Sequence, residues 1–374
     1  MTAESAAIVG VIGVGTMGAG IAQVALEAGH EVVIHDIDEV AIARGRERIR
    51  DGLARRATKL DLDADSIEEW IEGRLSRLRE SETIAGLATE VDVAIEAALE
   101  DLELKRDIFR ALDAASAPDA ILATNTSALS VAAIAEAATR PERIVGLHFF
   151  NPAPVMKLVE VVSGPRTDPS VADRAAALVA SWGKTAVRSA DSPGFIVNRV
   201  NRPFTIQALR IVEVGEASVE EIDAAIRADG FPMGPFELID LAGVDVNLAA
   251  ARGVWDGLGR PDRLRPSPIQ ERLVDAGRLG RKTGSGFYRY EGGRRASVDP
   301  EFAAEAPAIL AEVEIRDRIL AAVANEAREA AREGVATESD IDLALRLGAA
   351  HPMGPFERLR SPAGSTTRRH TIPS

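Results

Sequence analysis

The chain has 374 residues, a formal net charge of −14 and no cysteine. Its length predicts two or three domains, and the missing cysteines exclude disulfides, thiolate catalysis and thiolate metal sites. The acidic balance argues against a nucleic-acid partner, which needs clustered Lys and Arg. No run of about 18 apolar residues could span a bilayer, and the N-terminus does not read as a secretory signal. We therefore expect a cytoplasmic protein without a membrane or nucleic-acid partner.

The first stretch predicts a unit that binds a nucleotide. Residues 8–12 form an apolar run typical of a buried parallel strand, residues 13–18 carry the spacing G-x-G-x-x-G, and residues 19–28 follow a helical pattern. The first two glycines of this motif permit a tight turn close to a pyrophosphate, and the third lets the helix pack on the strand. The helix N-terminus then offers N–H groups to the phosphates. We expect the cofactor contacts of this loop to be Gly13, Gly15, Thr16, Met17 and Gly18.

A second predicted strand indicates which cofactor binds. Residues 31–35 end in Asp36, 18 residues beyond Gly18. A carboxylate at this place can accept hydrogen bonds from the ribose hydroxyls, and it would repel a 2′-phosphate. No Arg follows directly, so the sequence predicts NAD rather than NADP.

Residues 38–90 are charged and helical in period, and form a long crossover. Within them, Arg55, Arg56 and Lys59 make a small basic cluster in an acidic chain. Such a cluster is usually a solvated face, and alternatively it meets a substrate that carries phosphate. Local evidence favours the solvated face.

Two more strands are predicted, one over residues 91–100 that runs into a helix with Lys105, and one over residues 120–124. Asn125 and Ser127 follow the second of these strands. Ligands bind past the carboxyl ends of parallel strands in open α/β sheets, so these polar residues are candidates for a site. Alternatively, Ser127 caps the helix that starts near Ser130.

His148 is the candidate for proton transfer near neutral pH. It follows a predicted strand over residues 144–147, and a last predicted strand over residues 156–162 carries Glu160. A carboxylate can orient a histidine and stabilise its imidazolium form. Taken alone, His148 would read as a core histidine between two phenylalanines, but its place after a nucleotide-binding pattern favours catalysis. One more helix is expected over residues 167–182.

The chain changes character near residue 189. A start signal at residues 191–193 predicts a helix that runs to about Val214 and carries Asn198. Asn has poor helix propensity, so Asn198 serves either a buried hydrogen bond or a site.

An internal repeat follows in this half. Residues 215–223 and 232–237 recur, with one inserted residue, at 334–342 and 352–357. We expect the second copy to be structural, because Asn198 falls opposite Asp317 and is therefore not repeated. The predicted organisation is a Rossmann-type α/β domain, a helical domain, a linker, a second partial helical copy and a disordered tail, over residues 1–188, 189–290, 291–306, 307–360 and 361–374.

Taken together, these motifs resemble the L-3-hydroxyacyl-CoA dehydrogenases, NAD-dependent enzymes of β-oxidation and fatty acid metabolism that include 3-hydroxybutyryl-CoA dehydrogenases. They occur in the family's order over about residues 8–290. The resemblance implies an α/β Rossmann-type domain followed by an all-α domain. The second C-terminal copy resembles the tandem helical modules of multifunctional β-oxidation proteins. The motifs that carry the resemblance are residues 13–18, 125–127, 146–152, 191–199 and 232–237.

The resemblance also implies roles for single residues. His148 would be the catalytic base in the oxidation of L-3-hydroxyacyl-CoA to 3-oxoacyl-CoA, with Glu160 as its partner. Ser127 and Asn198 would bind the 3-oxygen of the substrate, with Asn151 near the same site. Positions expected at NAD are Asp36, Glu100, Lys105, Asn125, Ser127 and Asn151.

For the CoA moiety, the resemblance implies Lys59, and we add Arg55 from the same cluster. A Ser that the family commonly has nearby is Gly52 here. No metal is expected. Two alternatives are an NAD-dependent dehydrogenase of a free hydroxy acid such as L-gulonate, and a non-catalytic NAD-binding scaffold. We expect either a homodimer or a monomer in which the second helical copy takes the partner's place.

Overall fold

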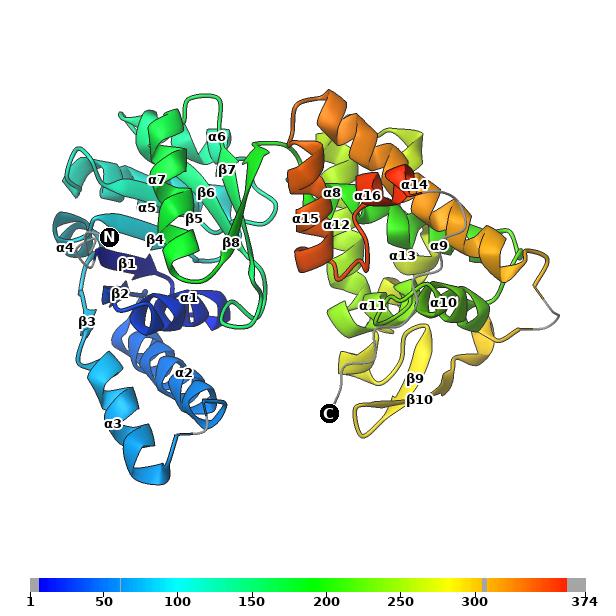
Figure 1. Cartoon of the computed structure of the whole chain (residues 1–374), viewed down its shortest axis with the longest axis horizontal. Helices are drawn as coiled ribbons and strands as arrows, with labels where there is room; N and C mark the ends of the chain where they lie inside the picture. Colours follow the sequence, from blue (N-terminus) through cyan, green and yellow to red (C-terminus); the bar gives the residue numbers. More distant parts are fainter. Residues whose placement is uncertain (1–6, 61, 305–307, 362–374) are drawn as a thin grey trace. The chain divides into compact units, whose positions relative to one another are not determined.

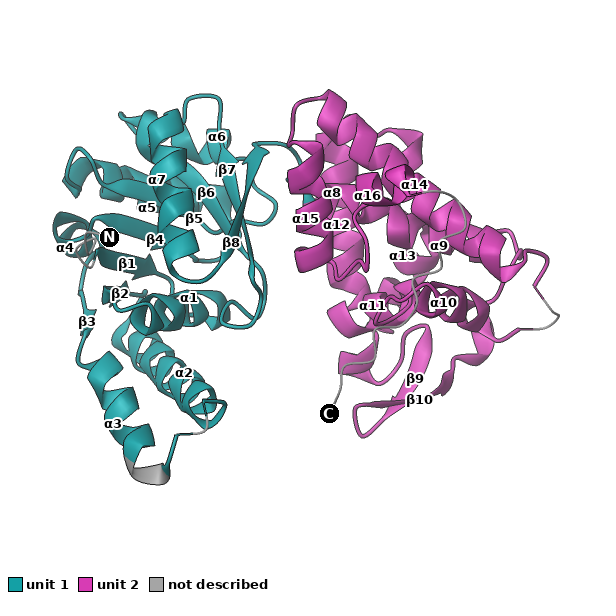
Figure 2. Ribbon diagram, in the orientation of Figure 1, with its two compact units in different colours: residues 1–196 teal, residues 197–374 magenta. Residues whose placement is uncertain are grey.

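The computed structural model describes residues 7–60, 62–304 and 308–361. The chain folds into two compact units, the first ending at Ile196 and the second beginning at Val197 (Figure 2). The first unit is α/β and the second is mainly helical, as the sequence predicts. The predicted disordered tail lies outside the described residues, apart from Ser361.

One eight-stranded sheet forms the centre of the first unit, with the order β3-β2-β1-β4-β5-β6-β7-β8. Neighbouring strands run parallel except β6 and β7, which are antiparallel. The first six strands follow the doubly wound order of dinucleotide-binding folds, whose ligand site lies at the carboxyl ends beside the first strand. The strands are β1 (Ile8–Ile12), β2 (Glu31–His35), β3 (Leu78–Glu80), β4 (Val93–Glu96), β5 (Ile121–Thr124), β6 (Ile144–Phe149), β7 (Leu158–Ser163) and β8 (Thr185–Ala190).

Helices cover both faces of this sheet (Figure 1). Successive residues of a strand point to opposite faces, so Ile34 packs in the cluster with Ile21 and Ile49, whereas Val33 packs in the cluster with Phe109. This two-sided burial explains the continuous apolar runs of the strands. The helices are α1 (Thr16–Glu27), α2 (Glu39–Thr58), α3 (Ala64–Leu75), α4 (Ile84–Glu90), α5 (Leu102–Ala115), α6 (Val131–Ala135), η1 (Pro141–Arg143) and α7 (Pro169–Ser181).

The second unit is a helical bundle with one hairpin, in which α14 packs against α9 and α10, and α15 against α8. Among the described residues, no helix is both long and apolar enough to cross a bilayer. The elements are α8 (Val197–Val200), α9 (Arg202–Glu213), α10 (Val219–Ala228), α11 (Pro235–Ala242), α12 (Val244–Gly257), η2 (Asp262–Leu264), α13 (Pro268–Asp275), η3 (Arg281–Thr283), β9 (Tyr288–Glu291), β10 (Arg294–Val298), η4 (Pro300–Phe302), α14 (Glu312–Arg332), α15 (Glu338–Gly348) and α16 (Pro355–Arg360).

The internal repeat of the sequence is also a repeat of structure. In the first copy, Asp223 of α10 accepts the backbone N–H groups of Phe236 and Glu237 at the start of α11. In the second copy, Asp342 of α15 accepts the N–H groups of the equivalent residues at the start of α16, at 2.7 and 3.0 Å. A Cβ at Gly234 or Gly354 would lie within 2.4 Å of the aspartate. Each copy therefore requires its glycine for the same close approach.

Three local predictions were wrong. The helix expected from about Pro193 to Val214 is divided into α8 and α9, which are separated by Asn201. The strand β8 was missed, since residues 156–162 were expected to form the last strand; the half-exposed residues of β8 lack a clear apolar run. Residues 294–298, expected within a linker, form β10 of a hairpin whose turn is Gly292–Gly293, both with positive φ. Two glycines between polar strands are a known hairpin signal.

Candidate functional site

The turn between β1 and α1 has the backbone shape that a dinucleotide requires. Gly13 adopts a φ of +84°, and its N–H donates to the carbonyl of His35 at 2.9 Å. A Cβ at Gly18 would lie 1.8 Å from the Gly13 carbonyl oxygen, whereas a Cβ at Gly15 would meet no atom within 4 Å. Helix α1 thus packs closely on the strand and leaves an open approach at Gly15, its N-cap. Free N–H groups at such a helix start favour phosphate.

Asp36 lies directly after β2 and is tied to this turn. Its Oδ2 accepts the N–H of Val14 at 2.7 Å, and its Oδ1 accepts the N–H of Ile37 at 2.7 Å. Of the two remaining loop residues, Met17 packs on the core and Thr16 is exposed. Both oxygens of Asp36 are thereby oriented beside the glycine-rich turn.

Glu100 organises the turn that follows β5. Its Oε1 accepts the hydroxyl of Thr126 at 2.6 Å, the N–H of Ser127 at 3.0 Å and the N–H of Ala128 at 3.1 Å. Burial raises the pKa of Glu100, but the hydrogen bond from Thr126 and the charge of Lys105 outweigh burial, so its pKa is lowered. The carboxylate is therefore ionised and holds the backbone that carries Ser127.

Lys105 is buried beside these carboxylates. Its Nζ lies 2.6 Å from Oε1 of Glu96 and 3.3 Å from Oε2 of Glu100. The other oxygen of Glu96 accepts the hydroxyl of Thr124 at 2.7 Å. Lys105 therefore binds the end of β4 to the turn after it, through two carboxylates.

Asn125 and Ser127 follow β5, as expected. Oδ1 of Asn125 accepts the N–H of Phe149 at 2.9 Å, which joins the ends of β5 and β6. Ser127 is exposed. The N-cap of α6 is Ser130, whose Oγ accepts the N–H of Ala133 at 3.2 Å. The alternative that Ser127 caps this helix was wrong.

His148 and Glu160 form a buried pair. They are direct partners in the antiparallel register of β6 and β7, and Nδ1 lies 2.6 Å from Oε2. The other oxygen of Glu160 accepts the N–H of Ile196 at 3.1 Å. The rings of Phe150 and Phe195 flank the imidazole, at centroid distances of 4.5 and 5.8 Å. The arrangement orients the ring and leaves Nε2 without a hydrogen-bond partner within the described part of the chain.

Asn151 and Asn198 lie in different units. Asn151 is exposed in the loop between β6 and β7, whereas Asn198 lies in α8 of the second unit and is partly exposed. The next residue, Arg199, is fully buried, and its guanidinium lies 2.9 Å from Glu326 and 2.7 Å from Glu333. Two ion pairs to α14 and its C-terminal end thus hold α8 in place.

A basic pocket of about 600 Å³ lies between α1, α2 and the loop after β6. Its cations are Arg48, Arg55, Arg56 and Lys59, which follow the spacing of one helical face. The structure therefore brings the predicted cluster together with Thr16 and Asn151 on the pocket wall. Arg48 was not predicted as part of this cluster. Its position seven residues before Arg55 places both on one face of a helix, so the sequence spacing could have indicated it.

The pocket also shows what replaces the family's serine. A Cβ at Gly52 would lie 2.0 Å from Oε1 of Gln23. Gln23 is buried, and its Nε2 donates to Glu27 at 2.7 Å. The amide of Gln23 therefore occupies the space that a serine side chain at position 52 would need.

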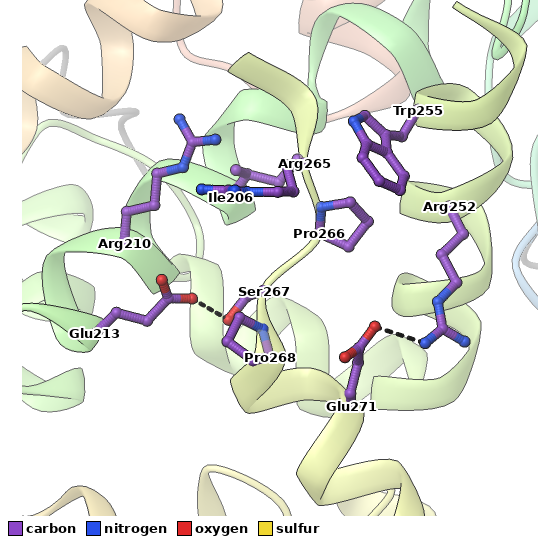
Figure 3. Close-up of a pocket in the computed structure, with 10 residues that line it drawn as sticks. All are labelled: Ile206, Arg210, Glu213, Arg252, Trp255, Arg265, Pro266, Ser267, Pro268 and Glu271. Carbon is purple, nitrogen blue, oxygen red and sulfur yellow. Dashed lines mark hydrogen bonds and ion pairs between the residues drawn. The ribbon is translucent and has the colours of Figure 1, made fainter. Parts of the chain in front are cut away.

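A separate pocket of about 470 Å³ lies in the second unit, between α9, α12 and α13 (Figure 3). Arg252 pairs with Glu271 at 2.6 Å across this pocket, and Glu213 accepts a hydrogen bond from Ser267. None of the predicted site residues lines it. In the described ranges, no group of three or more His, Asp or Glu side chains could hold a metal ion.

The strand order and the glycine-rich turn place the chain among the dinucleotide-binding α/β proteins. Comparison with known families is more specific. Residues 8–192 match the NAD binding domain of 3-hydroxyacyl-CoA dehydrogenase, and residues 194–290 and 315–370 both match its C-terminal domain. The chain belongs to the 3-hydroxyacyl-CoA dehydrogenase family and is an NAD-dependent enzyme of that family. The second match supports the repeat seen in the fold.

Several relatives are similar over most of their length. The 3-hydroxyadipyl-CoA dehydrogenase of Escherichia coli K12 is 38% identical over 93% of this chain and 89% of its own. The mitochondrial hydroxyacyl-coenzyme A dehydrogenase of Rattus norvegicus is 43% identical over 75% of this chain and 90% of its own. A solved structure of 3-hydroxybutyryl-CoA dehydrogenase from Escherichia coli K12 has a TM-score of 0.84 at 38% identity, covering 94% of this chain and 90% of that one.

Proposed function

We propose that the protein oxidises the C3 hydroxyl of an L-3-hydroxyacyl-CoA to the ketone, reversibly, and that His148 is the general base. The observation that carries the proposal is the pair of His148 with Glu160. One ring nitrogen is bonded to a buried carboxylate, and the second nitrogen is the one that can exchange a proton with a substrate.

The glycine-rich turn and Asp36 fit NAD. The open approach at Gly15 admits a pyrophosphate, and the Asp36 carboxylate can accept ribose hydroxyls and repel a 2′-phosphate. When bound, NAD supplies the acceptor for the hydride that leaves C3. The residues that would hold it are Gly13, Gly15, Thr16, Met17, Gly18, Asp36, Glu100, Lys105, Asn125, Ser127 and Asn151, with Lys105 acting through Glu100.

Proton transfer follows from the side chains of the chain itself. His148 takes the hydroxyl proton as the C3–H bond breaks, and Glu160 stabilises the imidazolium that forms. Ser127 and Asn198 donate hydrogen bonds to the C3 oxygen as it gains negative charge. In the reverse direction, His148 returns the proton to the same oxygen.

The basic pocket supports a CoA ester rather than a free acid. Arg55 and Lys59 lie on the same face of the α2 helix and its C-cap, in a chain of net charge −14. The phosphates of CoA would gain from this local positive potential. A free hydroxy acid, such as a sugar acid, carries a single carboxylate and would use fewer of these four cations than the phosphates of CoA would.

We also infer that the protein is a monomer. Helix α14 of the second copy packs on α9 and α10, and α15 packs on α8. These contacts cover helices of the first copy from within the same chain. Light scattering would show one chain per particle, and a stable dimer would contradict the inference.

NADH absorbance tests the reaction. We expect NADH to be consumed with acetoacetyl-CoA, and not with free acetoacetate. L-Gulonate with NAD is the second control. Activity on a free acid without activity on the ester would assign the chain to the acid-specific alternative. No turnover of any substrate, with NAD bound, would favour the non-catalytic scaffold.

A further inference from the structure

Arg202, the first residue of α9, is a buried cation without a counter-ion. Only 7% of its surface is exposed. Its Nε has no hydrogen-bond partner, and no ion pair of its guanidinium occurs within the described ranges. Burial alone lowers its pKa to about 10. Because an isolated charge is costly to bury, such a group normally has a partner.

The other two buried arginines of the described chain have such partners. Arg199 lies 2.9 Å from Glu326 and 2.7 Å from Glu333, and Arg143 lies 2.7 Å from Asp113. The contrast with Arg202 is sharp because Arg199 is only three residues away. The fold therefore supplies carboxylates where an arginine is structural and supplies none to Arg202.

The position of Arg202 relates it to the candidate substrate residue Asn198. The N–H of Asn201 donates to the carbonyl of Val197 at 3.0 Å, so a helical turn connects α8 to α9. Residues four apart on a helix lie on the same face, with Cβ atoms about 5–6 Å apart. Asn198 and Arg202 thus stand one turn apart on one face.

We propose that Arg202 binds a second carboxylate, at the far end of the acyl chain, so that the substrate class is a dicarboxylic 3-hydroxyacyl-CoA. This rests on the proposed function, in which Asn198 binds the C3 oxygen. In a six-carbon diacid the distal carboxyl carbon lies three bonds beyond C3. Three bonds in an extended chain span about 3.8 Å, as between neighbouring Cα atoms. This reach is shorter than the roughly 5–6 Å between the two Cβ atoms, and the long arginine side chain can cover the difference.

The guanidinium is suited to this ligand. It presents paired donors that match a carboxylate, and burial strengthens such a charge-assisted bond. The relatives' names include both a 3-hydroxyadipyl and a 3-hydroxybutyryl substrate. A butyryl chain ends in a methyl group and would leave the Arg202 charge unpaired. An adipyl chain ends in a carboxylate, which can pair with that charge.

The test compares two esters of equal length in the full-length protein, 3-oxoadipyl-CoA and 3-oxohexanoyl-CoA. We measure the ratio of their kcat/KM values by NADH consumption. The wild type should favour the diacid by about 10²-fold or more, and Arg202→Met should lower this ratio by about 10²-fold, the usual effect of removing one partner of a buried charge pair.

Arg210→Met is the matched control, because Arg210 lies on the same helix but lines the separate pocket of Figure 3. Its ratio should equal that of the wild type. If Arg202→Met does not fold, the test uses two other kcat/KM ratios. One is the ratio of the wild type, and the other is the ratio of Arg202→Lys, a variant that keeps the positive charge. A wild-type ratio of one or below, or an unchanged ratio in Arg202→Met, overturns the inference while the dehydrogenase activity stands. Failure to reduce either ester overturns the proposed function itself, and the inference with it.

Discussion

His148 on β6 and Glu160 on β7 are directly opposed in an antiparallel pair, which brings Nδ1 to 2.6 Å from Oε2. Side chains at opposed positions of two strands meet on one face of the sheet. The pair is therefore positioned by regular hydrogen-bonded backbone, not by the loop that connects the strands. This backbone pairing holds the imidazole in one orientation toward its carboxylate.

His148→Gln should lower kcat by about 10² or more, because glutamine cannot accept the hydroxyl proton. NADH binding, followed by fluorescence, should stay close to the wild-type value, since the glycine-rich turn is untouched. His35→Gln is a control, because this histidine bonds the carbonyl of Ser81 and lies outside the pair. Wild-type turnover in His148→Gln would remove His148 from the mechanism.

The Glu160→Gln variant removes the negative charge of this side chain and keeps its shape, so it tests the charge alone. Glutamine can still accept the N–H of Ile196, but it cannot stabilise a positive imidazolium. We expect kcat to fall by about 10² or more with little change in the folded structure. The exposed Glu142 supplies a matched Gln variant that should keep wild-type kcat. Equal kcat values in the two variants would contradict a role for the Glu160 charge.

The first unit was largely predictable because its local signals agree. The strand β1 is an apolar run, the turn after it needs glycine at Gly13, and Asp36 ends the next strand. Each of these three sequence features has one physical interpretation. The pairing of His148 with Glu160 was also predicted, although the sequence does not specify the antiparallel register that produces it.

Other features had no local signal. The edge strand β8 alternates between buried and half-exposed residues, so it lacks the continuous apolar run of the central strands. Arg202 reads as an ordinary helical arginine, because most arginines are exposed. Its burial and its missing counter-ion depend on packing between segments far apart in the sequence. Such properties appear only when the chain is folded.

The basic pocket predicts a change in substrate binding rather than in chemistry. Lys59→Ala should raise KM for acetoacetyl-CoA by about 10-fold and leave kcat nearly unchanged, since a phosphate contact acts equally before and during the reaction. Added salt should reduce the difference in KM between Lys59→Ala and the wild type, because these cations are exposed and salt screens them. Arg44→Ala removes a cation of α2 outside the pocket and should have little effect. Equal KM values in both variants would mean that the cluster is only a solvated face of the protein and does not bind the substrate.

Asp113 should make stability depend on acid. Burial raises the pKa of Asp113, but hydrogen bonds from Thr139 and Arg143 outweigh burial and lower it to about 2. The folded state thus favours the ionised form. Its contribution is fully present above the unfolded pKa near about 3.9 and is lost as the pH falls toward about 2.

Asp113→Asn should therefore lower the free energy of unfolding by about 1–3 kcal/mol at neutral pH, the usual cost of breaking buried charge-assisted hydrogen bonds. As the pH falls from about 4 toward about 2, the difference in unfolding free energy between wild type and Asp113→Asn should shrink, because the unfolded wild-type chain gains a proton at Asp113 while the folded state still favours the ionised form. Urea unfolding between about pH 7 and pH 3 measures both quantities. The exposed Asp119 provides an Asn variant that should stay close to wild type throughout. A difference for Asp113→Asn that does not change with pH would mean that the carboxylate charge contributes nothing, and that only the shape of the side chain matters.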